Sequence, residues 1–174
     1  MSVYPVREDT LLVKRNIGGQ ELEDLKFLEI GVGNAEISIT ASKKGADVIA
    51  VDKNFEAVEY ANKRFDEKDL DAEIFYSDLF GEVKHEFDLV VFNPPYLNGP
   101  KGIGDEEKWR GGENGLETSR LFLEKVDSYL KDNGEAWIVL SSNTDKTELV
   151  EDYSLEEIDR EKLWFETIFL YKFE

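Results

Sequence analysis

The residues best suited to chemistry form the run Asn93-Pro94-Pro95-Tyr96, which follows an apolar segment. Each proline holds its φ angle at about −65° and supplies no N–H group, so a carbonyl oxygen in this run is free to accept a hydrogen bond from outside. The Asn93 side chain adds a second acceptor, and the Tyr96 ring offers a face for stacking. Two acceptors side by side match the two hydrogens of a planar NH2 group. The run therefore predicts a site at which an amide or an aryl amine is the nucleophile.

Such an NH2 group is a weak nucleophile because its lone pair is delocalised. Two acceptors on its hydrogens help it to pyramidalise, and positioning supplies the rest of the rate enhancement. No dedicated base is expected, since the alkylated amide cation is strongly acidic. His85 is the only histidine and precedes the strand that leads to Asn93, so we expect a solvated loop residue there. The sequence predicts no metal site.

Two glycines, Gly31 and Gly33, follow another apolar segment, where they let the backbone turn tightly and approach a ligand closely. The last position of the dinucleotide fingerprint G-x-G-x-x-G is occupied here by Glu36, and Glu29 precedes the first glycine. Carboxylates beside a pyrophosphate are electrostatically unfavourable, whereas S-adenosylmethionine carries a sulfonium and an amino group and no phosphate. We therefore predict this cofactor, with Glu29, Gly31 and Gly33 at its site. A plain tight turn is the alternative.

Two aspartates end further apolar segments. Asp52 lies 21 residues after Gly31, a spacing at which a carboxylate accepts both ribose hydroxyls of a nucleotide. Asp78 is expected to accept from the exocyclic amine of adenine while Leu79 packs on the ring. For both aspartates the alternative is a surface residue at a strand end.

These residues need strands whose ends meet at one edge of a sheet, and the chain alternates strand-like and helix-like segments. The predicted strands are 25–31, 47–52, 72–77, 87–92, 136–140, 153–158 and 165–173; the predicted helices are 35–44, 55–68, 117–131 and 144–151, with a tight turn at 132–134. The alternation predicts an α/β fold in a single domain, 1–174. Its sheet is expected to be mostly parallel, with helices on both faces and an antiparallel pair at one edge. Ligands of such folds bind at the carboxyl ends of the strands.

The chain is strongly acidic, with 39 Asp and Glu residues against 21 Lys and Arg residues and a formal net charge of −18. Nucleic-acid binders usually present a basic face, so the charge argues against direct nucleic-acid binding and favours a basic protein surface; solubility alone is the alternative. The sequence shows no apolar stretch long enough to span a bilayer and no leader-like start. We therefore expect a cytoplasmic protein without a membrane partner. The absence of Cys excludes disulfides and thiolate sites in this chain.

Taken together, these motifs resemble the class I S-adenosylmethionine-dependent methyltransferases that modify planar nitrogens. Two further segments are similar to those of the archaeal and eukaryotic release-factor glutamine methyltransferases. Residues 4–10 (YPVREDT) resemble the N-terminal Y-x-P-x-E-D-T run of that family, and residues 109–117 (WRGGENGLE) resemble its W-x-G-G-x-x-G-x-E segment. The resemblance extends over nearly the whole chain.

The resemblance implies a Rossmann-like, seven-stranded sheet with a reversed last strand, and N5-methylation of the glutamine in the Gly-Gly-Gln loop of a translation release factor. It implies that Thr10 helps to close the cofactor site, that Asn93 faces both cofactor and substrate, and that Pro94, Pro95 and Tyr96 surround the glutamine amide. A small zinc-binding activator protein is the implied partner, and any zinc would belong to that partner. Ala35 stands where the family has a third glycine, and we expect its methyl group to be tolerated.

Two other functions remain open at this stage. An adenine amine is also a planar NH2 group, so the chain fits a nucleic-acid N6-adenine or exocyclic-amine methyltransferase as well. A non-catalytic cofactor-binding scaffold is the third reading. The glycine-rich loop 97–112 is expected to fold over the substrate.

Overall fold

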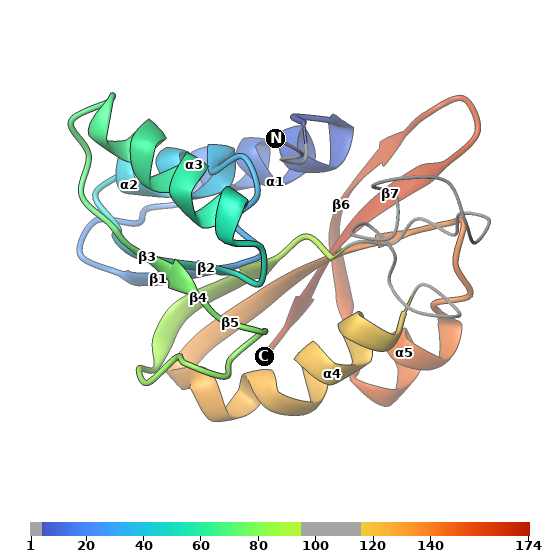
Figure 1. The fold of residues 1–174 in the computed structure, drawn as a ribbon. Coiled ribbons are helices and arrows are strands. Elements are labelled where there is room, and N and C mark those ends of the chain that lie inside the picture. Colours follow the sequence, from blue (N-terminus) through green and yellow to red (C-terminus); the bar gives the residue numbers. More distant parts are fainter. Residues whose placement is uncertain (1–4, 95–115) are drawn as a thin grey trace.

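The computed structural model describes residues 5–94 and 116–174, and their helices and strands alternate along most of the chain (Figure 1). The helices are α1 (Glu8–Gly18), α2 (Glu36–Ser42), α3 (Phe55–Asp66), α4 (Glu117–Val126) and α5 (Thr147–Asp152), and a short 3-10 turn, η2, spans Asp127–Tyr129. The strands are β1 (Lys26–Ile30), β2 (Asp47–Asp52), β3 (Glu73–Tyr76), β4 (Phe87–Phe92), β5 (Leu130–Ser141), β6 (Glu156–Lys162) and β7 (Thr167–Phe173).

The seven strands form one sheet in the order β3-β2-β1-β4-β5-β7-β6. The first five strands run parallel, whereas β7 lies antiparallel to both β5 and β6. The predicted α/β fold with an antiparallel edge pair is confirmed. The strand order reverses between β1 and β4, and a crevice opens at such a switch point, outside the carboxyl ends of the strands.

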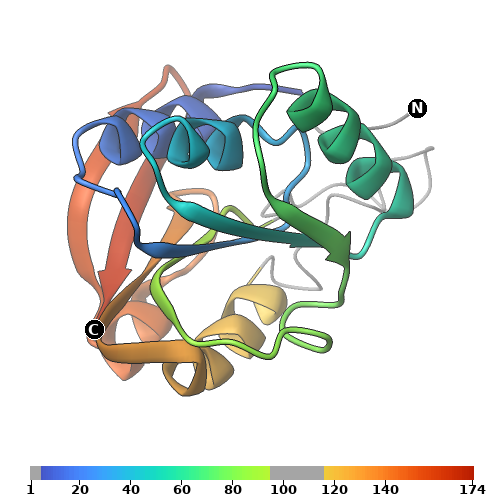
Figure 2. The same ribbon diagram turned by 90° about the vertical axis from the view of Figure 1, so that its left-hand side faces the viewer.

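Helices cover both faces of the sheet (Figures 1 and 2). The core between the sheet and α1, α2 and α3 contains Val48 and Ala50, and the core beneath the opposite face contains Ile49 and Val51. Neighbouring residues of β2 thus enter different cores, which requires the strand to be apolar throughout. This is why the run 47–52 was recognisable as a strand, and its predicted bounds agree with those of β2.

The segment between α4 and β5 differs from the prediction. Helix α4 ends at Val126 instead of continuing to 131, and the predicted turn at 132–134 lies inside β5. There, four residues of β5 lie opposite the single residue Asp88 of β4, which makes an irregular bulge. A Cβ atom on Gly134 would come within 2.5 Å of the Phe87 carbonyl oxygen, so this glycine allows a close approach of two strands and does not form a turn.

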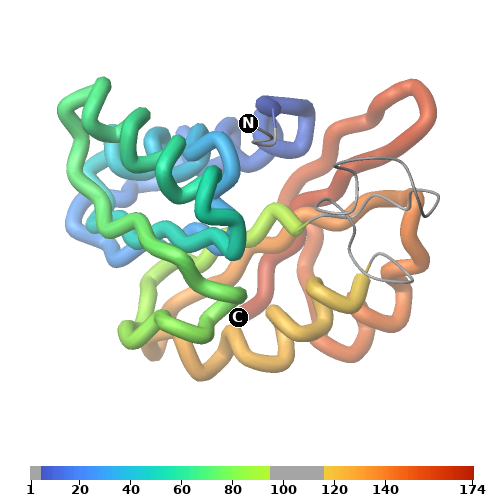
Figure 3. The backbone as a smooth tube through the Cα atoms, viewed as in Figure 1, coloured from blue at the N-terminus to red at the C-terminus, as the bar shows by residue number. Residues whose placement is uncertain are grey.

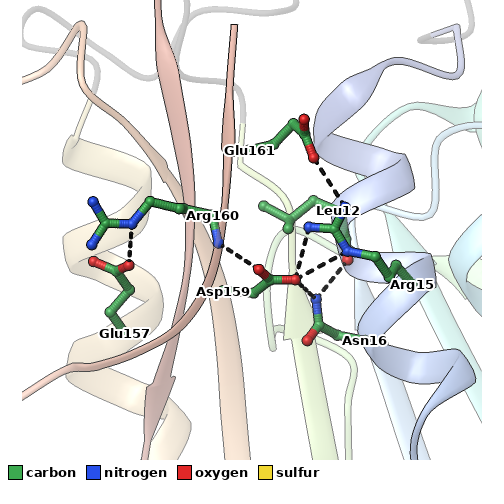
Figure 4. A network of polar contacts seen from close by, with 7 residues as sticks. All are labelled: Leu12, Arg15, Asn16, Glu157, Asp159, Arg160 and Glu161. Atoms are coloured by element: carbon green, nitrogen blue, oxygen red, sulfur yellow. Dashed lines mark hydrogen bonds and ion pairs between the residues drawn. The ribbon is translucent and has the colours of Figure 1, made fainter.

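Helix α1 was not predicted from the sequence, and polar contacts attach it to β6 (Figure 4). Arg15 bonds to Asp159 and Glu161, with closest distances of 2.8 and 3.0 Å, and the Asn16 amide donates to Asp159 at 2.7 Å. Leu12, one helical turn before Asn16, is buried in the core. The fold therefore holds α1 through residues far away in the sequence.

Phe55 is the first residue of α3. Its side chain is 66% exposed and stacks on Tyr76 of the edge strand β3, with ring centroids 4.3 Å apart. In the described part of the chain, no helix is both long enough and apolar enough to cross a membrane.

Candidate active site at the switch point

The strand ends that carry the candidate residues lie side by side. Ile30 at the end of β1 pairs with Phe92 of β4 on one side and with Val51 of β2 on the other. Asp52 in turn pairs with Tyr76 of β3. The loop after β1, Asp52, the turn after β3 and Asn93 consequently share one edge of the sheet, as the sequence predicted.

The loop after β1 turns sharply over the end of β2. The N–H groups of Gly31 and Val32 both donate to the Val51 carbonyl oxygen, at 2.8 and 2.9 Å. Gly31 has a φ of +74° and Gly33 of +45°, values that L side chains adopt at a cost. Ala35 also lies in this region, with a φ of +62°, at the position before α2. Its methyl group is accommodated as expected, although a glycine would adopt this backbone more readily.

Asp52 joins the end of β2 to the glycine loop. One carboxylate oxygen accepts from the Gly33 N–H at 3.0 Å, and the other accepts from the Asn54 N–H at 2.8 Å. Partial burial raises the pKa of the Asp52 carboxyl, and these amides oppose that rise. Each carboxylate oxygen has room for a further donor. The arrangement leaves acceptor capacity for a pair of hydroxyl groups.

Glu29 is buried on the face of β1 that α2 covers, with 3% of its surface exposed. Its carboxylate accepts from both the N–H and the hydroxyl of Ser38 on α2, a partner that the sequence analysis did not identify. Burial is the main cause that raises the pKa of Glu29, to about 8, and the bonds from Ser38 oppose it. At neutral pH this carboxyl is therefore mostly protonated.

Glu36 is neutralised inside the fold. It forms ion pairs with Lys14 of α1 and with Arg64 of α3, the latter at 2.5 Å. Burial acts to raise the pKa of Glu36, but these two cations outweigh it and lower that pKa. Arg64 also donates to the Asn34 carbonyl oxygen and so fixes the glycine loop. Glu29 and Glu36 therefore repel a pyrophosphate less than the sequence predicted, because Glu29 is mostly protonated and Glu36 is paired with two cations.

Asn93 follows β4 directly, at the switch point. Its side-chain oxygen Oδ1 is buried and has no hydrogen-bond partner among the described residues. A buried acceptor without a donor destabilises a fold, so this atom is available to a donor from a ligand. Pro94 is buried beside it. Pro95, Tyr96, the loop 97–112 and most of the segment 109–117 lie outside the described residues.

The turn after β3 holds the two adenine candidates, Asp78 and Leu79. The Ser77 hydroxyl donates to the Leu79 carbonyl oxygen at 2.9 Å and accepts from the Glu82 N–H at 3.0 Å, which closes the turn. Asp78 is exposed at the start of this turn. Leu79 has a positive φ of +49° and packs against the core that contains Ile49 and Val51. The structure therefore brings both to the expected edge.

Thr10 lies in the first turn of α1 and is 3% exposed. Its N–H and hydroxyl both donate to Asp9, at 2.6 and 3.3 Å. Helix α1 packs against α2, the helix that carries Ser38.

His85 is exposed and precedes β4, at the end opposite to Asn93. Within residues 5–94 and 116–174 no cluster of His, Asp and Glu has the make-up of a metal site.

The raised pKa of Glu29 predicts a pH-dependent stability. Between its ordinary value of 4.5 and about 8, the folded chain holds a proton that the unfolded chain releases, so the contribution of Glu29 to stability falls as pH rises through this window. The slope is at most about 1.4 kcal/mol per pH unit. Glu29→Gln should therefore gain stability relative to wild type from pH 5 to pH 8, measured by urea unfolding. Glu59→Gln, at an exposed site, is the control. A pH-independent difference for Glu29→Gln would refute the buried, protonated carboxyl.

Comparison with known proteins agrees with this geometry. The family model described as methyltransferase small domain matches residues 11–160. A provisionally named protein N5-glutamine methyltransferase of Methanocaldococcus jannaschii is 36% identical over 157 residues, which cover 85% of this chain and 77% of that protein. The chain spans 45% of the release factor glutamine methyltransferase of Streptococcus pneumoniae, less than half of that relative.

Solved structures share the fold. The Mtq2–Trm112 complex of E. cuniculi, responsible for the methylation of the termination factor eRF1, aligns with a TM-score of 0.78 at 23% identity over 100% of this chain and 99% of that chain. The T. thermophilus 16S rRNA N2 methyltransferase RsmC, solved with S-adenosylmethionine and guanosine, aligns with a TM-score of 0.74 at 19% identity over 100% of this chain and 45% of that chain. From the fold and these comparisons we conclude that this chain belongs to the methyltransferase small domain family and is an S-adenosylmethionine-dependent methyltransferase with a Rossmann-like fold.

Proposed function

We propose that the enzyme methylates the side-chain amide nitrogen of the glutamine in the Gly-Gly-Gln loop of a translation release factor. The observation that carries this proposal is the Oδ1 atom of Asn93 at the switch point, which is buried, has no partner among residues 5–94 and 116–174, and suits a donor NH2 group. The identity of the substrate draws its support from the relatives, among them the N5-glutamine methyltransferase of M. jannaschii and the eRF1-methylating complex.

The cofactor site that we propose fits the described residues. Asp52 has acceptor capacity for the ribose hydroxyls, and the turn at Gly31 lets the backbone approach a ligand closely. The full set of proposed cofactor contacts is Thr10, Glu29, Gly31, Gly33, Asp52, Asp78, Leu79 and Asn93. When bound, S-adenosylmethionine supplies an electrophilic methyl group.

At the acceptor side, Asn93 is proposed to accept a hydrogen from the glutamine amide, with a carbonyl of the adjoining prolines as the second acceptor. Pro94, Pro95 and Tyr96 are proposed to surround the amide plane. Because both hydrogens are then held, the nitrogen lone pair is aimed at the methyl carbon and conjugates less with the carbonyl. Asn93 would hold this nitrogen toward the methyl group that the cofactor would supply through its sulfur, and the methylated amide would release one proton to solvent.

We also infer a small activator subunit as partner, because the chain aligns over its whole length with a methyltransferase that was solved as a two-protein complex. Any zinc in that assembly would be held by the activator, since this chain has no cysteine.

A nucleic-acid amine remains the second candidate substrate, because the fold is similar to that of RsmC. The net charge of −18 disfavours it, because phosphates would be repelled. Membership of a methyltransferase family argues against the non-catalytic scaffold.

Transfer of a labelled methyl group tests the substrate. With the activator present, wild-type release factor should be labelled, and release factor in which the Gly-Gly-Gln glutamine is replaced should not be. Equal labelling of the two would reject the proposal. Transfer to RNA or DNA with a steep salt dependence would instead support the nucleic-acid candidate.

A further inference from the structure

The turn between β6 and β7 exposes two large aromatic side chains, Trp164 and Phe165, which we call the aromatic tip. Trp164 is 102% exposed and Phe165 is 77% exposed. The Leu163 N–H donates to the Glu166 carbonyl oxygen at 2.8 Å and closes the turn around them. Turns this tight usually contain Gly, Asn or Asp with positive φ, but neither aromatic residue has a positive φ. Neither turn geometry nor burial in the described core accounts for aromatic residues at this place.

The aromatic tip lies at the same edge of the sheet as the candidate active site. Because β7 is antiparallel to β5, Ile168 near its start pairs with Ser141 at the carboxyl end of β5. β5 in turn pairs with β4, which ends at Phe92, next to Asn93. Adjacent strands are about 4.8 Å apart, and Ser141 lies three residues beyond Ile138, the partner of Phe92. With a rise of about 3.3 Å per residue, the start of β7 therefore lies about 14 Å from the end of β4. The hairpin then extends further, away from the body of the sheet (Figure 3).

The base of the hairpin is held firmly. The Ser142 N–H donates to the Thr167 carbonyl oxygen at 2.9 Å, and the Thr167 N–H donates to the Ser142 hydroxyl at 2.9 Å. The Ser141 hydroxyl bonds to Glu166. On the other strand, Arg15 of α1 pairs with Glu161 (Figure 4). A partner would therefore meet preformed anchors, which reduces the entropy lost on binding.

The surroundings indicate what kind of partner fits. The hairpin from 156 to 167 carries five carboxylates and two cations: Glu156, Glu157, Asp159, Glu161 and Glu166 against Arg160 and Lys162. Arg15 and Lys172 pair with three of these carboxylates, so the negative charge that a partner meets comes mainly from the whole chain, with its net charge of −18. Exposed Trp and Phe residues are characteristic anchors of protein interfaces. An aromatic anchor on a chain with a net charge of −18 suits an apolar pocket with a basic rim on another protein, and this net charge repels a phosphate backbone.

We propose that the aromatic tip is a docking site for the methyl-acceptor protein, which it contacts outside the reacting side chain. This inference rests on the proposed function, in which the acceptor is a protein. The tip would hold the body of that protein while Asn93 receives its glutamine. Docking of this kind affects the binding of the intact substrate and leaves the chemical step unchanged.

The test compares Trp164→Ala/Phe165→Ala with wild type, in complex with the activator, on two substrates: the intact release factor and a short peptide of its Gly-Gly-Gln loop. Loss of two interface anchors should raise KM for the intact factor by about 10-fold to 100-fold. The kcat, the kinetics on the peptide and the Kd for S-adenosylmethionine should not change. Leu121→Ala, which removes an apolar side chain 48% exposed on α4, is the matched control and should behave as wild type.

An unchanged KM for the intact factor would overturn the docking proposal. An equal loss on the peptide would also overturn it, because the tip would then act on the reaction itself. Loss of activator binding in the double variant would reassign the tip to that partner. If the wild-type enzyme labels neither substrate, the proposed function fails and this inference fails with it. The two failures are therefore distinguishable by the wild-type result.

Discussion

Asn93→Ala is expected to abolish methyl transfer while leaving folding and cofactor affinity nearly intact. The variant removes the acceptor proposed to orient the amide, and loss of one such group typically lowers kcat by about 100-fold to 1000-fold. Folding should not suffer, because the deleted Oδ1 atom is buried without a partner among the described residues. Removal of an unsatisfied polar atom is neutral or stabilising. Single-turnover rates, thermal unfolding and calorimetry with S-adenosylmethionine measure the three quantities.

Asn143→Ala is the matched control, since Asn143 is an exposed asparagine just beyond the end of β5, the neighbouring strand. It should retain wild-type activity. If Asn93→Ala lowered cofactor affinity by the same factor as the rate, Asn93 would be a binding residue and the proposed role would be rejected. A marked drop in the unfolding temperature would show instead that Oδ1 has a structural partner.

Asp52→Ala is expected to raise the Kd for S-adenosylmethionine by about 10-fold to 100-fold, because each hydrogen bond to a charged group contributes about 1.5 to 3 kcal/mol. The variant removes the proposed ribose acceptor. It also leaves the N–H groups of Gly33 and Asn54 without the carboxylate that orders the glycine loop. Calorimetric titration measures the change, and kcat at saturating cofactor should fall much less than affinity.

Asp47→Ala provides the control, because Asp47 is exposed at the opposite end of the same strand, β2. Unchanged affinity in Asp52→Ala would remove Asp52 from the proposed cofactor site. A loss of affinity equal in both variants would point to a general effect of negative charge on a cationic ligand.

The sequence was sufficient for the parallel part of the fold because buried strands must be apolar on both faces. The runs 47–52 and 87–92 could be recognised for this reason, and they agree with β2 and β4. The turn predicted at 132–134 from the local sequence Asp-Asn-Gly was wrong. Pairing with β4 instead incorporates these residues into β5, and Gly134 serves the close approach to Phe87. Helix α1 was missed because it depends on contacts with Asp159 and Glu161, residues that no local pattern connects to it.

The sequence by itself determined the chemistry-bearing residues and their order: glycines after the first strand, Asp52 after the second, Asp78 after the third and Asn93 after the fourth. Parallel strands carry their ends to one edge, so residue types at strand ends were enough. Only the tertiary structure decided the charge states, because these depend on burial and on partners from other elements. It makes Glu29 mostly neutral, pairs Glu36 with two cations and leaves Asn93 Oδ1 without a partner among the described residues. It also brings the aromatic tip, which begins 71 residues after Asn93 in the chain, to the same edge, because β7 runs antiparallel to β5.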